Sequence, residues 1–192
     1  ALPILMNLKD IIAAFIRHRQ EVVTRRTMYE LRKARERGHI LEGLTVALAN
    51  IDEIIETIKT SANPAEARER LQAGEWAGGG VVALLEKAGS ISIRPDEIEG
   101  EDPSKPFGLQ GDIYRLSPTQ VAAILELRLH RLTGLEQDKL HAEYTEILGQ
   151  IAELTAILND FNLLMAVIKE ELALILQQYG DARKTSIVES RI

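Results

Sequence analysis

The sequence predicts an all-α protein, a long antiparallel coiled-coil hairpin with a small globular helical tip. Two long stretches carry apolar residues at alternating spacings of three and four, and about 80 residues without that regularity lie between them. Aromatic residues make up only 4% of the chain, which suits narrow helix seams better than a large globular core. Neither seam can be left in water, so we expect the two rods to fold back on each other.

The first rod is expected in residues 1–62, as one helix that begins near Leu8 and runs to about Lys59. At about 1.5 Å per residue, such a helix is about 75 Å long. Two glycines lie inside it, Gly38 and Gly43. A glycine inside a helix costs about 1 kcal/mol relative to alanine, so we expect any bend at these positions.

The tip is expected to be a helical domain over residues 63–133. Its first helix should start at Asn63, because Asn can cap it, Pro64 fits the first turn and Glu66 can complete a capping box. This helix should end by Gly74.

The second part of the tip combines a loop and a very apolar helix. Residues 90–112 are rich in Pro, Gly, Asp and Glu, and predict an exposed, partly irregular loop. A cap hydroxyl at Ser117 and Gln120 three residues later mark a helix start, and we expect that helix to end at a left-handed Gly134. Residues 121–132 are apolar around most of the helix, which predicts burial on more than one side. Either the tip wraps this helix completely, or part of it forms a two-fold dimer contact with a second copy of the chain.

The returning rod is expected in residues 134–180, with a seam from Leu140 to Tyr179. Its length would be about 60 Å, and Asp160 marks a possible kink. Residues 181–192 then form a return segment.

Charge is distributed unevenly along the chain. Residues 1–37 carry nine Lys and Arg against four Asp and Glu, residues 38–180 carry eleven against twenty-three, and residues 181–192 carry three against two. In an antiparallel hairpin the two chain ends meet, so the base should be basic and the shaft and tip acidic. A basic end attracts a polyanion and an acidic end repels one.

Groups for chemistry are missing from the sequence. His18, His39, His130 and His141 have no metal-ligand spacing, no phosphate-binding loop is present, and nothing resembles a nucleophile paired with a base. We expect no metal, no cofactor and no catalysis in this chain alone. It has no cysteine and no apolar run of 18 residues, so we expect a cytoplasmic protein without a membrane partner. The start at Ala1 suggests a piece of a larger protein.

Basic residues on the first helix have two interpretations. They are a solvated helix surface or subunit contact, or they lie near nucleic-acid phosphates. Tyr29 is the one aromatic residue among them, which makes no series of aromatics for base stacking, so any contact would be to the backbone. The possible DNA-proximal residues are Arg17, Arg19, Arg25, Arg26, Arg32, Lys33, Arg183 and Lys184.

Several short sequences occur in a fixed order, among them HRQEVVTRRT at residues 18–27 and LELRLHRLTGLE at residues 125–136. The others lie at residues 29–35, 39–44, 49–52 and 179–185. Together they resemble the A subunit of bacterial DNA gyrase, a type IIA DNA topoisomerase, over essentially the whole chain. The long insert after Asn63 and the sequence LTGLE favour gyrase over the related subunit of topoisomerase IV, which stays the alternative.

The resemblance implies an enzyme that passes one DNA duplex through a break in another and uses ATP to supercoil DNA negatively. This region would form the coiled-coil arm and the C-terminal exit gate, with a homodimer contact at the tip and double-stranded DNA passing the arms. Two A subunits would assemble with two gyrase B subunits, and ATP and Mg would bind outside this chain. The catalytic tyrosine of the family follows an arginine, whereas Tyr29, Tyr114, Tyr144 and Tyr179 do not, so no catalytic residue is expected here.

The gate should be a modest apolar patch that can open. We expect it to comprise Ile124, Leu127, Leu129, Leu132 and Leu135, with Arg128 and Arg131 at the rim. A hairpin used as a tether, or a nucleic-acid-binding module, would need the same seams and no active site. A dimer joined only at the tips would favour the gate over both.

Overall fold

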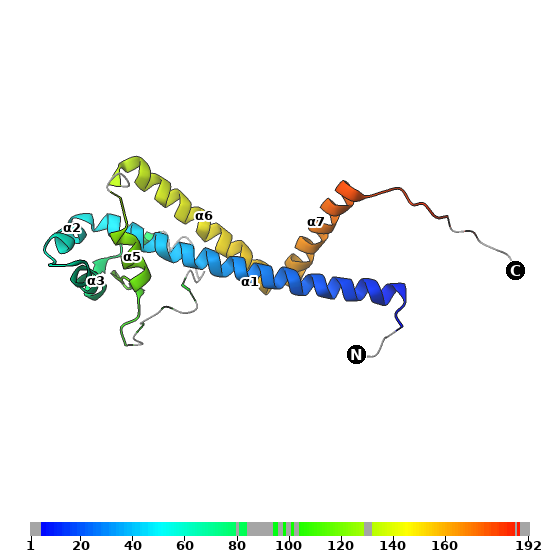
Figure 1. Ribbon diagram of the computed structural model, residues 1–192, viewed down its shortest axis with the longest axis horizontal. Coiled ribbons are helices and arrows are strands. Elements are labelled where there is room, and N and C mark those ends of the chain that lie inside the picture. The colour runs from blue at the N-terminus through cyan, green and yellow to red at the C-terminus, as the bar shows by residue number, and fades with distance from the viewer. Residues whose placement is uncertain are drawn as a thin grey trace. The chain divides into compact units, whose positions relative to one another are not determined.

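Helices form most of the computed structural model, with one small sheet (Figure 1). The structure describes residues 5–79, 81–83, 94–95, 98, 101, 104–128, 132–186 and 188. The chain divides into two compact units. The larger unit is Met28–Thr155, and the smaller unit combines Ala1–Thr27 with Ala156–Ile192.

The first rod is two helices, α1 (Leu8–Ala49) and α2 (Ile51–Lys59). The predicted start and end are confirmed, and Gly38 and Gly43, where a bend was expected, both lie inside α1 without interrupting it. The interruption is at Asn50, whose side-chain amide donates to Val46 O at 2.8 Å and to Ala77 O at 2.9 Å. A contact 27 residues away in the sequence therefore sets this boundary.

Helix α3 (Pro64–Ala73) follows the sequence prediction. The Asn63 side chain accepts from Glu66 N at 2.9 Å, and Gly74 is the C-cap. The Glu66 carboxylate accepts from Ala62 N at 2.8 Å, one residue before the cap. These local bonds satisfy amides that the first helical turn leaves without partners.

The structure contains a three-stranded antiparallel sheet that the sequence analysis did not predict, and its second strand lies at the end of the segment 90–112, where an exposed, partly irregular loop was expected. Its strands are β1 (Trp76–Ala77), β2 (Gly108–Gln110) and β3 (Ile113–Arg115), in the order β1-β3-β2. The β2–β3 turn contains Gly111 at a φ of +64°, where glycine is favoured. Strands of two or three residues are too short for apolar alternation to reveal them in a sequence. Much of residues 90–107 lies outside the described residues.

Helix α5 (Pro118–Leu125) starts as predicted and ends early. The capping box is present, with Gln120 N donating to Ser117 Oγ at 3.3 Å and Ser117 N donating to Gln120 Oε1 at 2.9 Å. The expected continuation to Leu132 is wrong, because Glu126 already caps the helix. The expected left-handed Gly134 is also wrong, since that residue begins the next helix.

The returning rod is likewise two helices, α6 (Gly134–Asn159) and α7 (Phe161–Tyr179). Asp160 interrupts them at the position where a kink was expected. Its backbone is extended, at φ −123° and ψ 111°, and its carboxylate accepts from Asn162 N at 2.8 Å as the cap of α7. No single helix in the described part of the chain is both long and apolar enough to cross a membrane, although α6 and α7 together meet that length and composition test.

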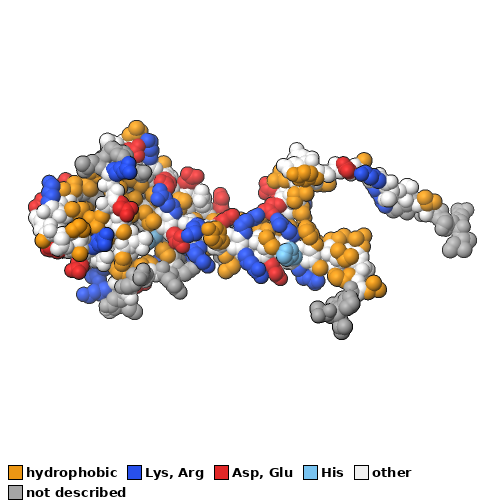
Figure 2. Space-filling model, viewed as in Figure 1, with side chains coloured by type: hydrophobic (Ala, Val, Ile, Leu, Met, Phe, Trp, Pro, Cys, Tyr) orange, Lys and Arg blue, Asp and Glu red, His pale blue; other side chains and the backbone are white. Residues whose placement is uncertain are grey.

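The larger unit holds most of the core. Its fully buried large side chains come from α1, α2, α3, β3, the β3–α5 connection, α5 and α6, and include Leu41, Val46, Ile54, Leu71, Tyr114, Leu116, Val121, Tyr144 and Ile151. In the smaller unit, Val23 on α1 and Ile168 on α7 are buried. Many other apolar side chains there are exposed, including Leu8 and Phe15 on α1 and Leu176 on α7 (Figure 2).

Candidate functional surfaces

The described gate residues of the prediction lie in the last turn of α5, in the segment after it and in the first turn of α6, all in the larger unit. Ile124 is only 5% exposed and belongs to the core of its own unit. Leu127 and Leu132 are half-buried, Arg128 is exposed, and Leu135 in the first turn of α6 is 68% exposed. The segment thus presents apolar groups to its surface although its regular helix has ended.

The other two predicted gate residues, Leu129 and Arg131, lie outside the described residues. Beside the described part of this segment is a groove of about 560 Å³ between α5 and the α2–α3 turn. It is lined by Ile58, Ser61, Ala62, Asn63, Pro64, Ala67, Arg68, Ala122, Leu125 and Glu126. Sequence reasoning missed this groove, because the two segments that form it lie more than 50 positions apart.

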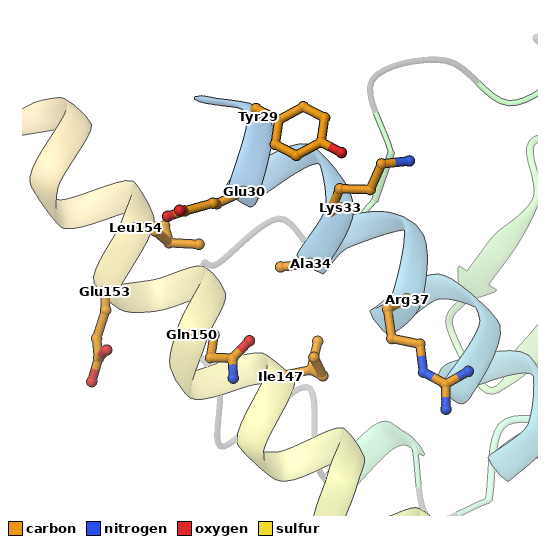
Figure 3. A pocket seen from close by; sticks show the side chains of 9 residues that line it. All are labelled: Tyr29, Glu30, Lys33, Ala34, Arg37, Ile147, Gln150, Glu153 and Leu154. Atoms are coloured by element: carbon orange, nitrogen blue, oxygen red, sulfur yellow. The ribbon is translucent and has the colours of Figure 1, made fainter. Parts of the chain in front are cut away.

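A second cavity, of about 450 Å³, lies between α1 and α6 (Figure 3). The small Ala34 side chain leaves space opposite Ile147 and Leu154, while charged side chains line much of the rest. Those cations already have partners in the unit: Lys33 Nζ is 2.7 Å from Glu36, and Arg37 Nη2 is 2.5 Å from Glu143. The base of the cavity is therefore apolar. Lys33 and Arg37, which line it, are already paired with carboxylates and are not free for acid–base chemistry.

Two arginines of the predicted DNA-proximal set share one carboxylate in the smaller unit. Arg19 and Arg26 on α1 both pair with Glu171 on α7, the second at 2.5 Å. Partial burial opposes ionisation of Glu171, but the hydrogen bond and charge of Arg26, followed by those of Arg19, lower its pKa. Both arginines thus act in an intrachain contact, which explains why they interrupt the apolar spacing of the first rod.

The other members of the set are more exposed. Arg25 is 3.7 Å from Glu21, and Lys184 is 3.6 Å from Asp181. Arg183 donates to Thr185 at 3.2 Å. Exposed pairs of this kind contribute about 0–1 kcal/mol, so they hold these cations weakly. Arg17 and Arg32, both on α1, are exposed as well.

The larger unit contains a buried network of polar side chains that sequence reasoning missed. We call it the polar chain; its members, in order of contact, are Tyr144, Glu42, Tyr114, Gln120, His39 and Ser117. The Ser117 capping box was the one local signal for it. Most of the other contacts join distant positions, such as His39 Nε2 to Ser117 Oγ at 2.7 Å across 78 residues.

Burial is the largest influence on the pKa values of His39 and Glu42 in the polar chain. It lowers the pKa of His39 to about 4, with the Arg94 charge acting in the same direction. It raises the pKa of Glu42, although hydrogen bonds from Tyr114 and Tyr144 oppose that rise. His39 is therefore neutral at pH 7. Within the described residues, no three His, Asp or Glu side chains are grouped so that they could hold a metal ion.

The chain is similar in sequence to a known protein family. The family model for the A subunits of DNA gyrase and topoisomerase IV matches residues 2–173. The DNA gyrase A subunit of Pseudomonas aeruginosa is 57% identical over 190 residues, which cover 99% of this chain and 20% of that protein. The Aeromonas salmonicida protein of the same name is 54% identical over 188 residues, with 98% and 20% covered. That of Escherichia coli is 58% identical over 142 residues, with 74% and 16% covered. The chain thus spans about a fifth of the length of the first two of these curated relatives.

Proposed function

The chain belongs to the family that comprises the A subunits of DNA gyrase and topoisomerase IV, and on that premise we propose that it forms the coiled-coil arm and exit gate of a DNA gyrase. The observation that carries the proposal is identity above 50% to gyrase A subunits over nearly the whole chain. A mechanical role as arm and gate also fits long helices that hold no catalytic group in the described residues.

Contacts within each unit support an antiparallel hairpin. In the larger unit, α1 and α6 are joined by the Arg37–Glu143 ion pair at 2.5 Å. In the smaller unit, Gln20 on α1 donates to Met165 Sδ on α7 at 3.1 Å. Each contact joins the first rod to the returning rod within its own unit, as an arm built from two helices requires.

The gate is proposed at the segment that follows α5, where two such arms would meet in a homodimer. Leu127, Leu132 and Leu135 supply partly exposed apolar surface, and the adjoining groove offers a concave seat. A small apolar contact suits a gate, because it can hold two subunits and still open. Ile124 would support this surface from the core rather than touch the partner.

Light scattering on the chain tests the gate. Leu127→Asp and Leu132→Asp should convert the dimer to a monomer, because a carboxylate would be buried without a partner in the contact. Met28→Asp is the matched control, since Met28 is 53% exposed on α1, and this variant should stay dimeric. A dimer that survives both leucine substitutions would exclude this surface.

The remaining roles apply to the complete protein. In it, we propose that two A and two B subunits pass a DNA duplex between the arms during ATP-dependent negative supercoiling in the bacterial cytoplasm. The catalytic tyrosine, ATP and Mg would lie outside this chain. The acidic shaft and tip would repel departing DNA. Charge reversal at Glu136 and Asp138 in the complete enzyme should therefore slow release of transported DNA, and unchanged supercoiling turnover would contradict this role.

A further inference from the structure

The polar chain runs from the returning helix to the helix that leads into the proposed gate. Tyr144 on α6 donates to Glu42 Oε2 on α1 at 3.1 Å, and the Tyr114 hydroxyl on β3 interacts electrostatically with the same carboxylate. Gln120 on α5 donates to the Tyr114 hydroxyl oxygen at 2.7 Å. Side chains alone therefore connect α6 to α5 across the interior of the larger unit.

The Glu42 carboxylate is the centre of this connection. It is 8% exposed, it accepts a hydrogen bond from the Tyr144 hydroxyl, and it interacts electrostatically with the Tyr114 hydroxyl. A buried carboxylate depends strongly on the groups that solvate it, so losing one hydroxyl alters its interaction with the other. A change at Tyr144 is thus felt at Tyr114, which uses the same carboxylate.

Gln120 occupies a tightly defined place at the other end. Its amide nitrogen also donates to His39 O at 2.7 Å, and its amide oxygen accepts from Ser117 N at 2.9 Å. A Cβ at Gly43 would lie only 2.6 Å from Gln120 Cγ, so glycine on α1 makes room for this side chain. Because its neighbours leave so little freedom, Gln120 transmits a displacement of its partners to α5.

We propose that the polar chain couples the position of α6 to that of α5, and that Tyr144 is a positioning residue for the gate segment although it lies on the opposite arm helix. The gate assignment of that segment rests on the proposed function, whereas the coupling itself does not. A gate mounted in this way would respond to movement of the returning helix without contact between that helix and a second copy of the chain.

Amide hydrogen exchange measured on the chain tests the coupling. Tyr144→Phe removes one hydroxyl and little volume, so residues 118–126 should exchange about three- to tenfold faster, as expected for one lost hydrogen bond. Exchange in α3 should stay unchanged. Tyr29→Phe is the matched control, because Tyr29 is 58% exposed on α1, and this variant should exchange like the unmodified chain.

A double variant separates coupling from ordinary core damage. Gln120→Met cuts the polar chain at its far end, so adding Tyr144→Phe to it should not accelerate α5 exchange further. Glu42→Gln, which keeps shape and weakens acceptance, should act like Tyr144→Phe and provides a second route if that variant folds poorly. Multiplicative effects in the double variant, or a uniform rise across the unit, would overturn the proposal. Light scattering of Leu127→Asp decides the gate separately.

Discussion

The two units bury their side chains in different ways, although α1 contributes to both. The larger unit has a closed core assembled from six helices or strands, and its buried polar groups bond to one another. The smaller unit has few buried apolar residues, among them Val23 and Ile168, and an ionic bridge at Glu171. Packing therefore sets the stability of the larger unit, whereas the smaller unit leaves much of its apolar surface uncovered.

Shortening one leucine in each unit should give the largest contrast. Leu71→Ala in the larger unit should cost about 2–5 kcal/mol in free energy of unfolding, because Leu71 is 0% exposed and a cavity would remain. Leu174→Ala on α7, where the side chain is 51% exposed, should change that free energy by less than about 0.5 kcal/mol. Urea unfolding followed by circular dichroism and by fluorescence of Trp76, the one tryptophan, measures both. Similar losses of unfolding free energy in the two variants would contradict this difference between the two units.

Acid should separate the units next. The pKa of His39 falls from 6.5 to about 4 on folding, so its stabilising contribution is complete above pH 6.5 and is lost as pH falls toward 4. The loss is on the order of 3 kcal/mol and belongs to the larger unit. The lowered pKa of Glu171 has its effect only below its ordinary value of 4.5, so the smaller unit should tolerate mild acid better.

The acid prediction is checked by Trp76 fluorescence during urea unfolding at several pH values. His39→Gln should remove most of the loss between pH 6.5 and 4. The raised pKa of Glu42 acts in the opposite direction, because its contribution is lost as pH rises, but it is present in both proteins and cancels. An identical acid loss in His39→Gln would show that another group is responsible.

Two glycines in helix interiors should give smaller effects of opposite sign. Gly43→Ala should destabilise the larger unit by about 1–3 kcal/mol, because the new methyl would collide with Gln120. Gly149→Ala on α6 should stabilise it by up to about 1 kcal/mol, since nothing lies within 4 Å and alanine is the better helix former. Thermal unfolding compares the two variants, and a stabilising Gly43→Ala would contradict the close contact.

The sequence predicted those features that depend on neighbouring residues. The Asn63 cap and the Ser117 capping box each involve only a few consecutive positions, and both helix starts were located correctly. The break at Asn50 depends on a carbonyl 27 positions away, and the early end of α5 on its surroundings, so periodicity could not reveal either. The polar chain was invisible for the same reason, because Tyr144 and Glu42 are 102 positions apart.

The family and the general helical class were within reach of the sequence, because ordered motifs and apolar spacing are both written along the chain. The candidate gate could be predicted from the sequence only in part. Sequence reasoning placed Ile124 at the surface with Leu127, but α5 turns Ile124 into the core, while the gate itself stays a prediction.

The seat that Gly43 makes for Gln120 also bears on the order of folding. A glycine weakens the middle of an isolated α1, so that turn gains little from local helix propensity. The space beside Gly43 is filled by Gln120 on α5, which lies far along the chain, so we expect this turn to gain stability from that contact. The centre of α1 and the short helix α5 should therefore fold in one cooperative step. Folding of α1 is then completed only when a segment much later in the chain is in place.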